Sequence, residues 1–177
     1  MRRILIPTLL FSLVSLASLG AAETPTTPEA KLAALGLTLP VTNTPIANYV
    51  PTVRTGNLVF LSGHLPFGPD GKVVAGKVGK DADEKLANAA ARTTALALLA
   101  SLKKEIGELS KVKRIVKVTG FVNGTPEFTS QSAVINGCSD LLVAVFGDRG
   151  KHARAALGMA SLPRGAVVEI EMIVEVQ

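Results

Sequence analysis

The stretch Ala166-Val-Val-Glu-Ile-Glu-Met-Ile-Val-Glu-Val176, near the end of the chain, decides the fold. Its side chains form two alternating sets. The first set is wholly apolar and consists of Val168, Ile170, Met172, Val174 and Val176. The second set mixes aliphatic and acidic residues and consists of Val167, Glu169, Glu171, Ile173 and Glu175. A period of two is typical of a β-strand, so we predict a strand whose apolar set faces a core.

The mixed set leaves two interpretations of the other face of this strand. Antiparallel sheets often leave one face in water, and the aliphatic residues there are then incidental. Alternatively, the face packs against another copy of the chain, and its charges gather where a site lies between subunits. The mixed composition is too apolar for a fully wetted surface and too charged for a core, which favours the second interpretation.

The preceding strand, expected over residues 154–160, introduces a candidate binding residue. We expect Arg154 and Glu169 to share the face opposite the core. The residues expected on that face of the earlier strand are Arg154, Ala156, Gly158 and Ala160, and those expected to face the core are Leu157 and Met159. An arginine beside such small residues has room to receive a carboxylate through two parallel hydrogen bonds. Taken alone, an arginine near a glutamate is also typical of an exposed ion pair.

The rest of the chain alternates strand and helix patterns in the order ββ(β)αβαββ. The expected strands cover residues 49–54, 58–62, 72–74 and 113–122 before the two described above, and the expected helices cover 81–109 and 129–146. The turns at 55–57 and 68–71 contain glycine and predict hairpins. The first helix has an inward stripe of alanines with Leu86, Leu96, Leu99 and Ile106, and the second has Val134, Cys138, Leu141 and Val145. We therefore predict an α+β fold, a mixed but mainly antiparallel sheet with two helices on one face.

The N-terminal residues divide the chain into three parts. Residues 1–22 have a basic start, an apolar run and small residues before Glu23, which predicts a secretory signal cut after Ala22. A retained membrane anchor is the alternative, although Pro7 and several hydroxyl residues dilute the apolar run. Residues 23–36 are expected to be a polar linker with a short helix at 31–35, and residues 37–177 a single domain. We accordingly predict a periplasmic or secreted protein with no membrane contact after cleavage.

Composition excludes several classes of protein. The chain of 177 residues is 47% hydrophobic and 19% charged, which is typical of a folded domain. One cysteine excludes an internal disulfide framework and two histidines exclude a multi-histidine metal site. Removing 22 residues, including Arg2 and Arg3, leaves 155 residues and lowers the net charge from +5 to +3. This weak charge and the 4% aromatic content argue against nucleic acid as a partner. We expect the basic residues Lys111, Lys113, Arg114 and Lys117 to be solvated.

Three motifs together resemble the Rid family, the reactive intermediate deaminases, also called the YjgF family. They are Tyr49-Val50, Thr55-Gly-Asn-Leu-Val-Phe-Leu-Ser-Gly63, and Arg154 followed by Leu162-Pro163 and by Val168-Glu169-Ile170-Glu171. The spacing of the arginine, proline and glutamate is the most specific part. The resemblance implies a chorismate-mutase-like fold assembled as a homotrimer, with a site in each cleft between neighbouring subunits.

The resemblance also implies an activity and assigns residues to it. The best-known members of this family hydrolyse enamine and imine intermediates, such as 2-aminoacrylate, to 2-oxo acids and ammonia without a metal or organic cofactor. Arg154 corresponds to the arginine that binds the substrate carboxylate, and Glu169 to the glutamate that positions water. Tyr49 and Asn136 correspond to residues that line the cleft, and Gly63 and His64 are candidates for the same role.

Two departures from the family pattern and two alternatives remain. His64 stands where the family usually has glutamine, and Ala155 and Ala156 replace small polar or cysteine residues, so we expect a divergent member with a modified pocket. One alternative is a non-catalytic protein that binds small 2-oxo acids in the same cleft. The other is a ribonuclease or translation inhibitor, which the predicted export disfavours. We assign Cys138 to the core, because it lies on the apolar stripe of its helix.

Overall fold

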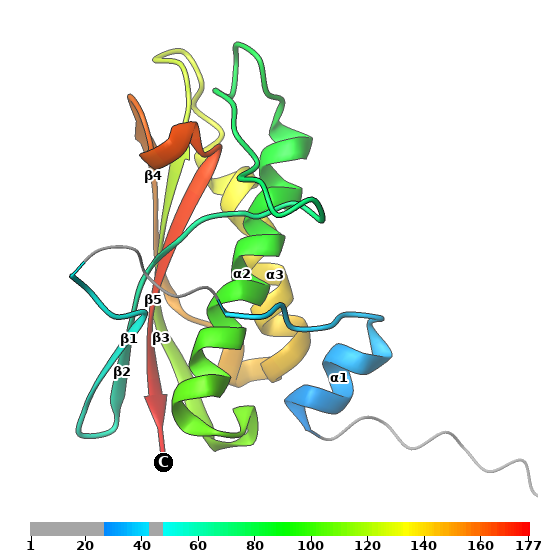
Figure 1. Cartoon of the computed structure of the whole chain (residues 1–177), viewed down its shortest axis with the longest axis vertical. Helices are drawn as coiled ribbons and strands as arrows, with labels where there is room; N and C mark the ends of the chain where they lie inside the picture. Colours follow the sequence, from blue (N-terminus) through cyan, green and yellow to red (C-terminus); the bar gives the residue numbers. More distant parts are fainter. Residues whose placement is uncertain (1–26, 43–47) are drawn as a thin grey trace, which may run out of the picture.

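A computed structural model of the chain describes residues 27–42 and 48–177 (Figure 1). The predicted signal peptide, its cleavage site after Ala22 and the first residues of the predicted linker lie outside the described residues. Within the described part, strands and helices follow one another in the predicted order, preceded by one further short helix.

The strands form one five-stranded sheet in the order β1-β2-β5-β3-β4. The strands are β1 (Thr52–Thr55), β2 (Leu58–His64), β3 (Val112–Asn123), β4 (Ala153–Met159) and β5 (Val168–Val176). All neighbours are antiparallel except β3 and β4, which are parallel. The hairpin of β1 and β2 is confirmed, and so is the mixed, mainly antiparallel sheet. The expected strand at 72–74 forms only one isolated bridge, between Val73 and Phe67.

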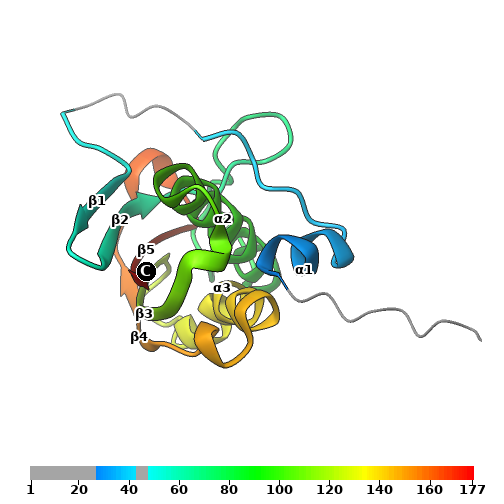
Figure 2. The same cartoon turned by 90° about the horizontal axis from the view of Figure 1, so that it is seen from below.

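Helices α2 (Glu84–Ile106) and α3 (Gln131–Phe146) lie side by side on one face of the sheet (Figures 1 and 2). The helix α2 begins after Asp83, whose carboxylate accepts a hydrogen bond from the Leu86 backbone N–H at 2.7 Å. It ends at Gly107, whose φ of +84° favours glycine. The predicted helix over 81–109 was therefore three residues too long at each end.

A short helix, α1 (Pro28–Ala34), corrects the predicted linker. It begins at Pro28, three residues before the expected start, because the Thr27 hydroxyl caps it by accepting from the Ala30 N–H at 3.1 Å. The Glu29 carboxylate accepts from the Leu109 N–H at 2.8 Å, and Leu32 is only 3% exposed in the core. Residues 28–36 therefore pack as part of the domain.

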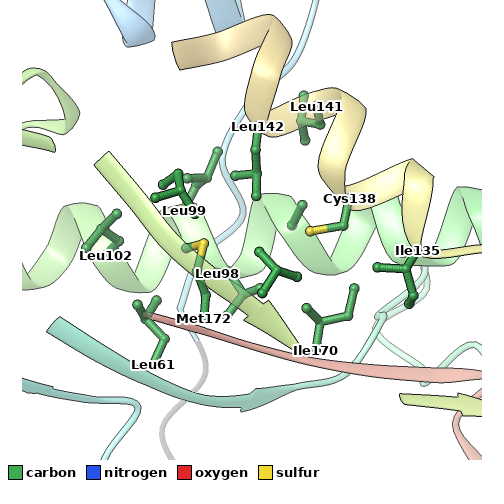
Figure 3. Packing of buried hydrophobic residues seen from close by; sticks show 14 of the residues in the cluster. Leu61, Leu98, Leu99, Leu102, Ile135, Cys138, Leu141, Leu142, Ile170 and Met172 are labelled. Carbon is green, nitrogen blue, oxygen red and sulfur yellow. The ribbon is translucent and has the colours of Figure 1, made fainter. Parts of the chain in front are cut away.

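The core lies between the sheet and the two long helices (Figure 3). The apolar set of β5 is buried as predicted, and so are the four stripe residues of α3. Burial raises the pKa of the Cys138 thiol to about 12, which keeps it protonated and confirms its place in the core. On α2 the alanine stripe, Leu99 and Ile106 are buried as predicted. Leu86 is instead 43% exposed, and Leu98 and Leu102 also fill the core.

The prediction of which β4 side chains face the core is wrong. Arg154 pairs with Val118 of β3, and Val118 is completely buried under the helices. The Arg154 side chain therefore extends from the helix-covered face of the sheet. Leu157 pairs with Phe121, which also pairs with Glu169, so Leu157 and Glu169 share the open face. Leu157 is 46% exposed. Because β4 is an edge strand, its alternation did not reveal which set is covered; only its register with β3 does.

We predict that Gly137→Ala destabilises the packing of α3 on α2. A Cβ at Gly137 would overlap the backbone carbonyl of Asn88, where the two helices approach closely. The Asn88 amide also donates to the Ala133 carbonyl at 2.8 Å, so the contact has little freedom to open. Chemical denaturation should show a loss of about 1–3 kcal/mol. Ala144→Ser, which adds one atom on the exposed side of α3, is the control; equal stability of the two variants would contradict the close contact.

Candidate functional site

A hydrogen-bonded cluster surrounds Arg154 at the edge of the sheet. The guanidinium Nη1 of Arg154 donates to Asn136 Oδ1 at 2.8 Å and to Ser139 Oγ at 3.0 Å. Asn136 and Ser139 lie one turn apart on α3, which places both on the side of the helix that faces β4. Asn136 was predicted from the family motif, and the structure brings it into direct contact with Arg154.

His152 extends this cluster and has a defined tautomer. Its Nδ1 lies 2.7 Å from the Gly150 carbonyl oxygen, and its Nε2 lies 3.0 Å from Ser139 Oγ. A carbonyl only accepts, so Nδ1 carries the proton and Nε2 accepts from the Ser139 hydroxyl. Burial lowers the pKa of His152, and the charge of Arg154 lowers it further. The imidazole is therefore neutral at neutral pH.

A second cluster lines a groove at the end of β2. The groove has a volume of about 640 Å³, and its lining includes Tyr49, Ser62, Gly63, His64, Ser101 and Arg164. Three of the predicted site residues, Tyr49, Gly63 and His64, thus come together. A register shift in the pairing of β2 with β5 lies between Leu61 and His64, and such irregularities redirect side chains.

The groove has an apolar wall and a polar floor. Pro40, Leu65 and Phe67 contribute apolar surface, and the Arg164 guanidinium lies 5.6 Å from the centre of the Phe67 ring. His64 accepts through Nε2 from the Ser101 hydroxyl at 2.7 Å, because its Nδ1 donates to the Ser62 carbonyl at 2.7 Å. Burial lowers the pKa of His64, so this ring is neutral as well.

Glu169 lies beside the groove and is half-buried on the open face of the sheet. A Cβ at Gly63 would overlap its carboxylate, so the Glu169 side chain lies directly against the Gly63 backbone. Burial raises the pKa of Glu169, and the neighbouring Glu171 raises it further. A carboxylate whose pKa is raised accepts a proton more readily than an ordinary one, as a general base requires.

The structure does not bring Arg154 and Glu169 together within one chain. Strand β3 lies between β4 and β5. The side chains of Arg154 and Glu169 extend from opposite faces of the sheet. The expectation that they share a face is therefore wrong for a single protomer. One chain presents two separate groups of candidate residues, which we call the Arg154 cluster (Asn136, Ser139, His152 and Arg154) and the Tyr49 groove (Tyr49, Gly63, His64, Ser101 and Glu169).

Sequence reasoning did not identify Ser139, His152 or Ser101 as functional residues. Two local signals pointed to the first two: Ser139 follows Asn136 by three residues on a helix, and His152 precedes Arg154 by two residues, directly before β4. Ser101 contacts His64 from a different element, 37 residues away, so no local pattern indicated it.

The described residues were also searched for metal sites and membrane spans. In residues 27–42 and 48–177, no three His, Cys, Asp or Glu side chains are grouped so that they can hold a metal ion. Within the same ranges, none of the helices has the length and apolar character needed to cross a bilayer.

Comparison with known proteins identifies the family. Residues 29–176 match the family described as "YjgF/chorismate mutase-like, putative endoribonuclease". Protein TCP17 of Trypanosoma cruzi is 44% identical over 147 residues, which are 82% of this chain and 92% of that protein. The crystal structure of a protein of unknown function from Agrobacterium tumefaciens is 49% identical with a TM-score of 0.79, over 85% of this chain and 92% of that one. The chain belongs to the YjgF/chorismate mutase-like family.

The family includes proteins named as deaminases. The 2-iminobutanoate/2-iminopropanoate deaminase of Escherichia coli is 30% identical over 128 residues, which are 72% of this chain and 87% of that enzyme. The fold class predicted from the sequence is confirmed by the family match and by the structural similarity.

We predict that Glu169→Gln stabilises the protein at neutral pH. The raised pKa means that the folded state holds this proton more tightly than the unfolded state does. The wild type therefore loses stability as pH rises from below the ordinary value of 4.5 through the raised pKa, and glutamine does not. Thermal unfolding should give a higher Tm for the variant at neutral pH and equal values well below pH 4.5. The exposed Glu127→Gln is the control, and a Glu169→Gln variant with a lower Tm at neutral pH would contradict the assignment.

Proposed function

We propose that this protein hydrolyses small imino acids, such as 2-aminoacrylate and its imine form, to 2-oxo acids and ammonia. The observation that carries the proposal is the anchored guanidinium of Arg154. Its Nη1 is held by Asn136 and Ser139, while Nε and Nη2 have no hydrogen-bond partner among the described residues. An arginine fixed at one end, with parallel donors left at the other, is suited to bind a planar carboxylate.

The chemistry requires few groups beyond those present. A protonated imine carbon is electrophilic, so water adds to it once both are held in position. Glu169 accepts a proton from that water, forming a carbinolamine, and collapse of this intermediate releases ammonia and leaves the 2-oxo acid. We propose that Arg154 holds the carboxylate during both steps, with Tyr49, Gly63 and His64 lining the cleft and no metal or cofactor taking part.

We further propose that the site is completed by a second protomer in a homotrimer. In one chain, the side chains of Arg154 and Glu169 extend from opposite faces of the sheet. To act on one substrate molecule, the Arg154 cluster of one copy must therefore meet the Tyr49 groove of a neighbouring copy. The open face supports such an assembly, because Val53, Phe60, Leu157 and Met159 are large apolar residues that are 37–55% exposed there. Large apolar side chains exposed on one face of a sheet favour its burial against another copy of the chain.

The main alternative is a protein that binds 2-oxo acids in the same cleft without turnover. This alternative is motivated by the departures from the family pattern at His64, Ala155 and Ala156, because they alter the predicted pocket. Both functions require binding of the carboxylate by Arg154, and only the first requires turnover. Because residues 1–22 predict export, we expect the natural imines to be formed outside the cytoplasm, for example by oxidation of amino acids.

We predict that Arg154→Ala abolishes most of the catalysis of imine decay. An imine generated in situ by an amino-acid oxidase should disappear faster with the wild-type protein than in buffer. Each charge-assisted hydrogen bond contributes about 1.5–3 kcal/mol, so the variant should lose kcat/KM by roughly tenfold or more. Arg154→Lys should also be impaired, because lysine lacks the planar donor pair.

Arg92→Ala is the control, since Arg92 lies on α2 outside both groups of candidate residues. Decay at the buffer rate with wild-type protein, across imines of several amino acids, would reject the enzymatic function. A calorimetric titration with pyruvate then tests the binding alternative, which predicts saturable binding that Arg154→Ala weakens.

We predict that Leu157→Glu disrupts the trimer. A charge at this exposed position of β4 would have to be desolvated in the proposed interface, so light scattering should show a smaller species and the deaminase activity should fall. Leu86→Glu, at a residue of similar exposure in the first turn of α2, should change neither the size of the assembly nor the activity. Wild-type protein that runs as a single protomer, or a Leu157→Glu variant that stays trimeric, would refute the assembly.

A further inference from the structure

Within residues 27–42 and 48–177, the Arg154 guanidinium is held by hydrogen bonds at one nitrogen, Nη1. A guanidinium has five N–H donors, two on each terminal nitrogen and one on Nε. Asn136 Oδ1 and Ser139 Oγ, at 2.8 and 3.0 Å, take both donors of Nη1. The three donors on Nε and Nη2 remain, and one from each nitrogen points in the same direction. The edge formed by Nε and Nη2 therefore accepts a carboxylate side-on.

Ser139 is the central residue of this arrangement. Its oxygen accepts from Arg154, and its proton is directed to His152 Nε2 at 3.0 Å. His152 in turn donates through Nδ1 to the Gly150 carbonyl at 2.7 Å. The donors thus run in one direction, from Arg154 through Ser139 and His152 to the backbone. Hydrogen bonds aligned in this way strengthen one another.

The neutral state of His152 preserves this direction. The groups around the ring are Ser139 on α3, Arg154 on β4 and the backbone of Gly150. Burial and the nearby guanidinium both lower the pKa of His152, so Nε2 keeps its lone pair at neutral pH. A protonated ring would instead place a second cation and a competing donor at the oxygen that anchors Arg154.

We propose that Ser139 and His152 are positioning residues that fix Arg154 so that its Nε–Nη2 edge selects ligands with a planar carboxylate. This inference rests on the proposed function, because it assumes that Arg154 binds the carboxylate of the ligand. Neither residue contacts the ligand in this arrangement. Their effect is to spare the ligand the cost of ordering a long, flexible side chain. The arrangement discriminates against uncharged amides of the same shape, which offer only one oxygen to the two donors.

The test compares the binding of pyruvate with that of pyruvamide by calorimetry, using the purified protein. In Ser139→Ala the guanidinium loses one anchor, so the Kd for pyruvate should rise roughly three- to tenfold while that for pyruvamide changes little. Ser139→Thr keeps the hydroxyl and should restore most of the affinity. His152→Gln keeps an acceptor oxygen near the position of Nε2 and should bind nearly as tightly as the wild type. Ser132→Ala, at an exposed serine of the same helix, is the control.

A spectroscopic measurement tests the anchoring without any ligand. In ¹⁵N NMR spectra of the arginine side chains, identified by comparison with Arg154→Lys, the anchored guanidinium should give resolved Nη signals. These signals should collapse in Ser139→Ala, because rotation about the Cζ–N bonds is no longer hindered. A purely structural role for Ser139 would weaken pyruvate and pyruvamide equally and would not be rescued by threonine.

The possible failures are distinguishable. If Arg154→Ala loses pyruvate binding but Ser139→Ala binds pyruvate as tightly as the wild type, the positioning role is overturned and the proposed function stands. Unchanged Nη signals in Ser139→Ala would likewise overturn the positioning role and leave the proposed function standing. If the wild type fails to bind pyruvate and every other small 2-oxo acid, the carboxylate site is wrong and both proposals fall.

Discussion

The two central strands, β3 and β5, are covered on one face by α2 and α3, and this burial is the constraint on which the other features depend. Val118, Ile170 and Met172 are at most 1% exposed, and the buried positions of β5 alternate with more exposed ones. Because the side-chain period of a strand is two, covering one face fixes which residues appear on the other. The open face therefore receives Glu169, Glu171 and Ile173 as a direct consequence of how the core is filled.

The same constraint accounts for the separation of the candidate residues. Strand β4 pairs with β3 alone, and its register places Arg154 beside α3, where Asn136 and Ser139 can reach it. Glu169 is fixed on the opposite face by the register of β5 with β3. A single sheet therefore cannot direct both side chains at one small molecule, and a proposal that uses both must bring two copies of the chain together.

The electrostatic character of both groups follows from partial burial. His64 and His152 each donate through Nδ1 to a carbonyl two residues earlier and accept a serine hydroxyl at Nε2, so both are neutral and fixed in tautomer. Burial lowers the pKa of both histidines and raises the pKa of Glu169, which favours the protonated carboxyl. In the part of the chain that the structure describes, Arg154 is restrained by hydrogen bonds and has no acidic partner, which leaves its charge available for an anionic ligand.

The sequence by itself determined the five strands, the two long helices, the alternation of β5 and the family, because each of these depends on residues close together in the chain or on a motif. The tertiary structure alone decided which face of β4 is covered, since an edge strand with small residues buries either set at little cost. It also decided the docking of α1 and the contacts of Ser139 with Arg154 and of Ser101 with His64. These depend on register and on the approach of distant segments, which are set by the packing of the whole domain and not by local periodicity.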